Sequence, residues 1–126
     1  MSDHTRRPLI ALGASLDDLG EMPIEIRRAF GRAIRVAQYG AFPEDSRPFG
    51  EGLPREVLKL IESHHGDTYR AAVVVEFPEC VYLLHVFKKK ASSGKATPKP
   101  VLDTIRARWS AAKEHHRITY GPGSKT

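Results

Sequence analysis

Residues 57–87 read VLKLIESHHGDTYRAAVVVEFPECVYLLHVF, and this stretch decides the fold. It contains three runs rich in β-branched, leucine and aromatic side chains, which favour strands. The turn-forming sequence His-His-Gly-Asp at 64–67 separates the first two runs, and Pro-Glu at 78–79 separates the second from the third. Short connections between successive strands predict an antiparallel meander, with strands at 57–62, 68–77 and 80–87.

Alternation along the second of these strands divides its side chains between two faces. One set is expected in the core: Tyr69, Ala71, Val73, Val75 and Phe77. The other set is expected on an open face: Thr68, Arg70, Ala72 and Glu76. We therefore expect Arg70 to lie on an exposed or cleft-lining surface.

Before the meander, the sequence predicts one short strand and two helices. Residues 7–12 are apolar after a proline and indicate an edge strand, and Ser15 followed by Asp18 has the spacing of a helix capping box. Residues 23–40 then carry an apolar stripe of helical period, formed by Ile26, Phe30, Ala33, Ile34 and Ala37. The two helices are expected to form a hairpin that packs on an apolar surface.

After the second helix, residues 41–54 are rich in Pro and Gly and predict a loop. Beyond the meander, Thr97 is a suitable N-cap for a final amphipathic helix that extends to about residue 115. The order β-αα-βββ-α indicates an α+β domain over residues 1–118, followed by a flexible tail at 119–126. We expect all the helices to cover one face of a small antiparallel sheet.

Charge is distributed unevenly along the 126 residues, which carry a formal net charge of +5. Residues 1–63 contain nine basic and ten acidic side chains, whereas residues 64–126 contain eleven basic and five acidic ones. Five lysines and no acid lie between Val86 and Lys99. A segment of one sign attracts polyanions, RNA or DNA first among them, although a lysine-rich solvated loop would have the same composition.

Other classes of protein fit the sequence poorly. The longest apolar runs are a few residues, too short for a membrane span, and no secretory signal begins the chain. A single cysteine, Cys80, excludes an intrachain disulfide framework. These features favour a cytoplasmic protein that does not act at a membrane.

Three sequence elements together have a known counterpart. They are Tyr69-Arg70 in the second strand, the run from Leu84 through His85, Phe87 and Lys88-Lys89-Lys90, and Thr97-Pro98 before the last helix. This combination resembles the RelE/HigB superfamily of toxins from type II toxin–antitoxin systems, in particular its phage-derived HigB-like branch. The resemblance extends over most of the chain, from about residue 8 to residue 114.

The resemblance implies a ribosome-dependent mRNA endonuclease that enters the ribosomal A site and cuts the message without a metal ion or other cofactor. It also implies a cognate antitoxin, expected to be of the helix-turn-helix type, that blocks the toxin and contacts operator DNA on its behalf. The expected fold is RelE-like, with helices on one face of the sheet and the RNA groove on the other.

RNA cleavage of this kind uses the 2′-hydroxyl as the nucleophile on the adjacent phosphate. The protein must help to remove a proton, stabilise charge on the phosphoryl oxygens and protonate the leaving oxygen. Four residues are candidates for these catalytic roles: Arg70, His85, Lys89 and Lys90. Six further residues are candidates for RNA contacts: Lys59, Lys88, Lys95, Lys99, His64 and His65.

Structural roles compete with these assignments. His85 alternates with apolar residues and could be a hydrogen-bonded core histidine, and Arg70 could pair with Glu62 or Glu76 across the sheet. The lysines could serve only as an electrostatic surface for RNA, and Trp109 and Tyr82 could be core residues. Two other functions also remain open: a ParE-like toxin that inhibits DNA gyrase without nuclease activity, and an inactive protein that binds RNA or antitoxin.

Overall fold

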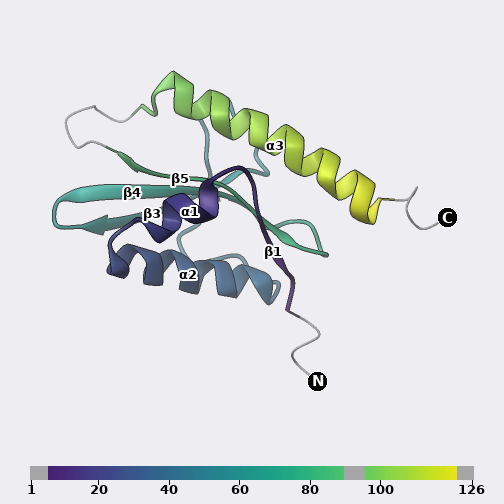
Figure 1. Ribbon diagram of the computed structural model, residues 1–126, viewed down its shortest axis with the longest axis horizontal. Coiled ribbons are helices and arrows are strands. Elements are labelled where there is room, and N and C mark those ends of the chain that lie inside the picture. Colours follow the sequence, from purple (N-terminus) through teal and green to yellow (C-terminus); the bar gives the residue numbers. More distant parts are fainter. Residues whose placement is uncertain (1–5, 90–95, 122–126) are drawn as a thin grey trace.

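The computed structural model describes residues 6–89 and 96–121 and shows one mixed sheet between two layers of helices (Figure 1). The elements in chain order are β1 (Leu9–Ala11), α1 (Ser15–Gly20), α2 (Ile24–Gln38), β2 (Arg47–Pro48), β3 (Leu58–His64), β4 (Asp67–Val74), β5 (Val81–Lys89) and α3 (Lys99–Tyr120). The predicted α+β class and element order are confirmed. The short strand β2 lies within the segment that was predicted to be a loop.

The strands lie in the order β1-β5-β4-β3-β2. The meander β3-β4-β5 is antiparallel, as predicted, and β1 forms an edge of the sheet. The prediction of a wholly antiparallel sheet was wrong, because β1 runs parallel to β5 through the register Leu9↔Val81 and Ala11↔Leu83. Composition gives no information about this pairing, since the two strands are far apart in the chain.

The helices cover both faces of the sheet, so the expectation that they all lie on one face was wrong. In Figure 1, α2 lies below the sheet and α3 lies above it, while α1 is drawn in front of the strands; Leu19 of α1 packs in the same cluster as Phe30 of α2. The α2 side buries one cluster with members such as Phe30, Tyr69 and Leu83. The α3 side buries a second cluster, which includes Ala72, Val74, Tyr82, Leu84, Ile105 and Trp109. The central strands are therefore apolar on both faces. Trp109 and Tyr82 are core residues, and both pack in the cluster on the α3 side.

A β-bulge shifts the register of β5 relative to β4 between Ala72 and Val73. Ala72 pairs with His85, whereas Val73 pairs with Leu83, so Leu84 is the additional residue. A bulge of this kind allows two successive side chains to occupy the same face of a sheet. It places both Leu84 and His85 on the α3 side while Leu83 lies on the α2 side, so the strict alternation along β5 that was assumed for His85 does not hold.

Two predicted helix caps are replaced by longer-range hydrogen bonds. The Ser15 hydroxyl is buried and donates to the Leu83 carbonyl of β5 at 3.2 Å instead of capping α1. Thr97 does not cap α3, whose N-cap is Pro98. By contrast, Gly40 has φ +94° two residues after the end of α2, the left-handed conformation in which glycine commonly ends a helix. α3 also continues through Tyr120, five residues beyond its predicted end.

Candidate nucleic-acid interface

Basic side chains form a diagonal row on the α3 side of the sheet, in which Lys59 and Arg70 are partly exposed and Lys89 is buried. Lys59 of β3 and Ala72 of β4 are register partners, and Arg70 lies two residues from Ala72 on the same face. Lys89 of β5 pairs with Thr68, which lies two residues from Arg70 on the other side. Lys59, Arg70 and Lys89 are thus diagonal neighbours on three adjacent strands, and we call them the cationic row. Diagonal cross-strand neighbours are within reach of long side chains.

The row extends to the edge of the sheet through a residue that was not among the predicted site residues. Arg47 of β2 is the register partner of Lys59, and its charge contributes to lowering the pKa of that lysine. Arg47 lies in a segment with no periodicity, so only the Arg-Pro dipeptide before a buried phenylalanine could have drawn attention to it.

Arg70 is half-buried, and it has an unsatisfied donor. Its Nε atom is inaccessible to solvent and has no hydrogen-bond partner among the described residues. Neither of the ion pairs considered for it is present, because Glu62 is the register partner of Tyr69 on the opposite face and Glu76 lies beyond the end of β4. A half-buried guanidinium group that forms no ion pair with the described residues is suited to an external oxyanion such as phosphate.

The environment of Lys59 lowers its pKa. Burial is the largest cause, the neighbouring charge of Arg70 acts in the same direction, and the carboxylate of Glu51 partly opposes them. The ammonium group also lies 5.0 Å from the centre of the Phe49 ring, within range of a cation–π contact. A lysine with a lowered pKa can exchange a proton more readily near neutral pH than an ordinary lysine can.

Aromatic rings line the cationic row. Phe87 is the register partner of Arg70, and its ring centre lies 6.5 Å from that of Phe49. On its other side, the His85 ring is stacked on Phe87 at 5.5 Å with an interplanar angle of 21°. Phe49 is almost fully buried, whereas Phe87 and His85 are partly exposed. Partly exposed rings beside cations are typical of surfaces that bind single-stranded nucleic acid, because bases stack on the rings.

Glu51 connects the loop before β3 to the start of α3. Its two carboxylate oxygens accept hydrogen bonds from the Thr97 backbone N–H at 2.7 Å and from the Thr97 hydroxyl at 2.8 Å. Burial alone would raise the pKa of Glu51, but these hydrogen bonds and the charges of Lys59 and Arg70 lower it. The pair therefore fixes a negative charge beside the cationic row.

Backbone conformation explains how Glu51 reaches this position. Glu51 has φ +55° and lies between Gly50 at +79° and Gly52 at +84°. A left-handed conformation is unfavourable for a residue with a side chain, so Glu51 must be held by other interactions, and its bonds to Thr97 supply them. The Gly-Glu-Gly sequence was the signal that could have identified this residue in advance.

His85 lies on the same face as the row but is already hydrogen-bonded. Arg108 of α3 donates to the His85 Nδ1 atom at 3.0 Å and to the Leu84 carbonyl at 2.9 Å. A guanidinium group only donates, so Nδ1 is the acceptor and the neutral ring carries its proton on Nε2. Burial is the main cause that lowers the pKa of His85, and the charge of Arg108 adds to it, while Asp18 opposes them. The histidine is therefore both anchored and kept neutral near pH 7.

Several predicted site residues are not part of this surface. Lys88 is the register partner of Tyr69 on the α2 side, where it forms an ion pair with Asp67 at 3.1 Å. His64 is also on the α2 side, with its Nε2 atom 3.7 Å from Glu25 of α2.

The remaining predicted residues lie at turns, at the start of α3 or outside the described ranges. His65 is exposed in the turn between β3 and β4, and Lys99 is exposed at the start of α3, bonded to Asp103. Lys90 and Lys95 lie outside the described residues.

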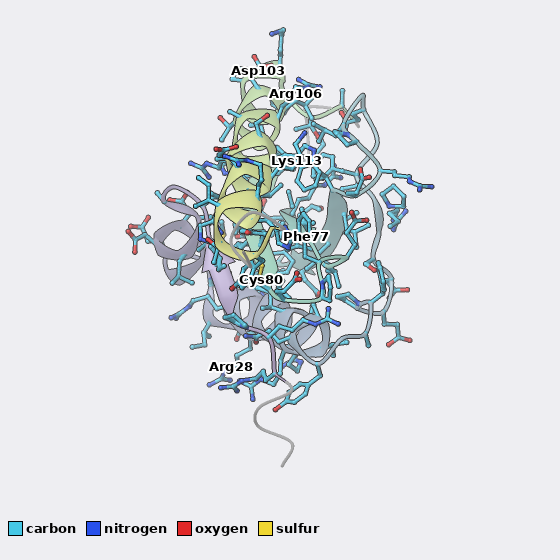
Figure 2. All side chains as sticks on the ribbon, turned by 90° about the vertical axis from the view of Figure 1, so that its right-hand side faces the viewer. Arg28, Phe77, Cys80, Asp103, Arg106 and Lys113 are labelled. Atoms are coloured by element: carbon cyan, nitrogen blue, oxygen red, sulfur yellow. The ribbon has the colours of Figure 1, made fainter. Side chains whose placement is uncertain are left out.

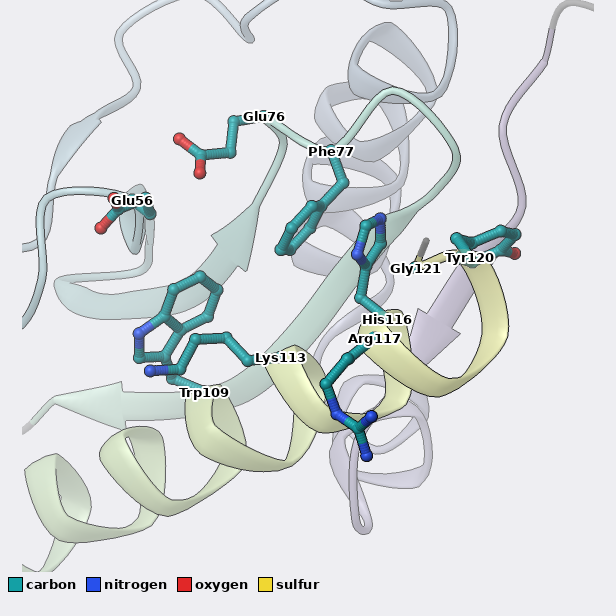
Figure 3. Close-up of a pocket in the computed structure, with 9 residues that line it drawn as sticks. All are labelled: Glu56, Glu76, Phe77, Trp109, Lys113, His116, Arg117, Tyr120 and Gly121. Atoms are coloured by element: carbon teal, nitrogen blue, oxygen red, sulfur yellow. The ribbon is translucent and has the colours of Figure 1, made fainter. Parts of the chain in front are cut away.

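A separate pocket lies at the other end of α3 (Figure 3). It has a volume of about 530 Å³, and none of the predicted site residues lines it. Its walls are largely aromatic: Phe77, Trp109, His116 and Tyr120. Over the part of the chain that the structure describes, no cluster of three or more His, Cys, Asp or Glu side chains could hold a metal ion. Within the same ranges, none of the helices is long and apolar enough to span a membrane.

The chain was compared with known proteins at the levels of family, sequence and structure. No curated protein matches it, and no solved structure does. A family model described as "Phage derived protein Gp49-like (DUF891)" matches residues 17–110, which include β2 to β5 and the first half of α3. The matched region contains Lys59, Arg70 and Lys89. The chain therefore belongs to the phage-derived Gp49-like family, which is associated with toxin–antitoxin systems.

Proposed function

We propose that this protein is a toxin that cleaves mRNA on the ribosome, with the cationic row as its RNA-binding and catalytic surface. Family membership implies a toxin of a toxin–antitoxin system and a cognate antitoxin partner. The cleavage activity rests on the resemblance to RelE/HigB toxins and on the chemistry of the site. The observation that carries it is the placement of Lys59, Arg70 and Lys89 as diagonal neighbours beside the partly exposed Phe87 ring.

The proposed reaction is attack of a ribose 2′-hydroxyl on the adjacent phosphorus. The O2′–P bond forms as the P–O5′ bond breaks, which gives a 2′,3′-cyclic phosphate and a 5′-hydroxyl. Negative charge grows on the phosphoryl oxygens in the transition state, and a guanidinium group offers paired, permanently charged donors to them. Arg70 is proposed for this role, because its side chain is partly exposed and forms no ion pair with the described residues.

Proton transfer requires one group that accepts the 2′ proton and one that protonates the leaving 5′ oxygen. Lys59 is a candidate for either step, since burial and Arg70 lower its pKa. Neutral His85 can donate only a hydrogen bond from Nε2, because its Nδ1 atom already accepts one from Arg108, so it is proposed to hold a phosphoryl oxygen while solvent water exchanges the second proton. Lys89 is proposed to bind a phosphate oxygen next to the scissile bond.

Mapping of message ends after brief induction in cells tests this proposal. The wild-type protein is expected to produce new 5′ ends within translated codons, and Arg70→Ala is expected to remove them. Lys88 and Lys89 are adjacent in β5 but lie on opposite faces of the sheet, and since Lys89 is buried whereas Lys88 is exposed, circular dichroism first confirms that both variants are folded. Lys89→Ala should reduce cleavage more than Lys88→Ala does.

Two results would contradict the proposal. One is toxicity with intact messages, especially if DNA supercoiling changes, as a ParE-like gyrase inhibitor would cause. The other is cleavage that persists after both Arg70 and Lys59 are replaced by Ala.

A further inference from the structure

The outer face of α2 carries a row of unpaired arginines. Arg28, Arg32 and Arg35 are spaced i, i+4 and i+7, so they lie along one side of the helix. All three are exposed, and none of their side chains forms an ion pair or hydrogen bond with another residue in the ranges 6–89 and 96–121. Like charges at this spacing oppose helix formation slightly, so folding of α2 gives no reason for them. We call these residues the arginine stripe.

Beyond the arginine stripe, the same end of the molecule exposes large apolar side chains. Val36 is 41% exposed, Tyr39 is 50% exposed and Phe42 is 61% exposed. A hollow of about 470 Å³ is lined by Arg32, Arg35, Val36, Tyr39 and Ala41. A second hollow of about 310 Å³ lies between the three arginines and Gly31. The surface therefore combines fixed positive charge with apolar hollows that a side chain can enter.

Its place in the fold separates this surface from the cationic row. α2 lies on the face of the sheet opposite α3, whereas the cationic row lies on the α3 side. In Figure 2, Arg28 is at the opposite end of the view from Asp103 and Arg106 of α3. A ligand bound to the cationic row would not reach the arginine stripe. The two basic surfaces therefore require separate explanations.

The charges around the stripe favour a protein over a nucleic acid. A third hollow joins Arg32 to three carboxylates, Glu44, Asp45 and Glu62. A nucleic-acid backbone is negative along its whole length and would meet these carboxylates, whereas a peptide can place acidic residues against the stripe and neutral or basic residues against the carboxylates. A peptide helix with acidic residues on one part and apolar residues on the other satisfies both halves. α2 has 15 residues and is therefore about 22 Å long, enough to pack against several turns of a partner helix.

We propose that the arginine stripe, with Val36, Tyr39 and Phe42, binds an acidic amphipathic segment of the cognate antitoxin. This inference assumes the part of the proposed function that gives the protein an antitoxin partner. It does not assume RNA cleavage. Antitoxin bound in this way contacts the α2 side of the sheet and leaves the cationic row uncovered by this contact.

Titration with the purified product of the adjacent reading frame tests the proposal. Arg32→Glu/Arg35→Glu should raise the dissociation constant by about 10- to 100-fold, because two complementary charges are reversed at once. Its effect should shrink in 0.5 M salt. Tyr39→Ala should raise the constant by about tenfold at both salt concentrations, as expected for a buried aromatic anchor. The matched control Arg55→Glu/Lys113→Glu makes the same change of net charge on exposed residues away from α2 and should bind within twofold of wild type.

Circular dichroism of each variant confirms that it is folded before binding is measured. The proposal is overturned if the wild-type chain does not bind the adjacent product at micromolar concentration, or if the stripe variants bind as well as wild type. It is also overturned if the control weakens binding equally, or if the stripe variants lose affinity for single-stranded RNA but not for the antitoxin.

Message cleavage is measured in parallel and without antitoxin, so that failure of the two proposals can be told apart. The stripe variants should cleave as wild type does. A wild-type protein that binds antitoxin through the stripe but cuts no message would refute the proposed function and leave this inference intact.

Discussion

Replacement of Arg70 by Met tests whether this side chain serves ligand binding at the expense of folding. The Arg70 Nε–H is buried without a hydrogen-bond partner among the described residues, and an unsatisfied buried donor costs about 1–3 kcal/mol. Lys59 lies close enough for the two charges to affect each other, and relief of repulsion at a partly exposed site adds at most about 0.5 kcal/mol. Met retains an unbranched apolar stem. Because only one of the five guanidinium donors is known to be unsatisfied, we expect Arg70→Met to raise the free energy of unfolding by about 1 kcal/mol, near the lower limit of that range.

Urea denaturation followed by the fluorescence of Trp109, the chain's single tryptophan, measures this change. Arg108→Met is the matched control, because Arg108 also contacts the α3 side of the sheet but donates to Leu84 and His85. Loss of those hydrogen bonds should lower the free energy of unfolding by about 1–2 kcal/mol. The two substitutions should therefore change stability in opposite directions. If Arg70→Met destabilises the protein by as much as Arg108→Met does, Arg70 is a structural residue and the reasoning is refuted.

Three further predictions concern the Glu51–Thr97 hydrogen bonds, His85 and the hydrophobic core. Glu51→Gln and Thr97→Val should each lower the free energy of unfolding by about 1 kcal/mol, because each weakens hydrogen bonds to a carboxylate. Amide hydrogen exchange at residue 97 should also become faster, and unchanged exchange would contradict a stabilising role for the Glu51–Thr97 hydrogen bonds. The pKa of His85 is lower in the folded chain than in the unfolded chain, so the unfolded chain takes up this proton first as pH falls below about 6.5, and stability falls with it. His85→Gln should remove that part of the pH dependence between about pH 6.5 and 5, measured as the difference between the two urea-denaturation series. Identical pH dependence in both proteins would be inconsistent with a partly buried histidine whose pKa is lowered by folding. Phe30→Ala should lower the free energy of unfolding by about 3–5 kcal/mol, because Phe30 is 1% exposed. Phe42→Ala, at a 61% exposed site, should lower it by less than about 0.5 kcal/mol in the same assay, and similar losses at both sites would show that the core is assigned incorrectly.

The sequence predicted the meander and the helices well, because their signals are local. The apolar stripe of α2 and the three strand-forming runs each lie within one continuous segment, and turn residues mark their ends. The parallel pairing of β1 with β5 depends on contacts between residues more than 60 positions apart, which no local pattern reports. Likewise, Ala72 and Val74 pack under α3 because that helix crosses the second face. Their apolar character was the available signal that this face is covered.

The candidate site was predicted in part, for similar reasons. Strand alternation placed Arg70 on its face correctly, and β-sheet register brings Lys59 and Lys89 beside it. The composition of a lysine run, however, does not indicate which lysine lies on the same face as Arg70. The strand register places Lys89 on that face and Lys88 on the α2 side. Glu51 was missed because its position depends on a left-handed turn and a partner 46 residues away.

Cleavage of a defined message on purified ribosomes tests the central claim most directly. Wild-type protein should cut within the codon in the A site and leave a 2′,3′-cyclic phosphate and a 5′-hydroxyl. Arg70→Met should bind the same ribosomes and remain folded, yet cut about 10²- to 10³-fold more slowly, as expected when one preorganised donor to the developing charge is removed. An unchanged rate for Arg70→Met, or products that end in a 3′-hydroxyl, would contradict the account.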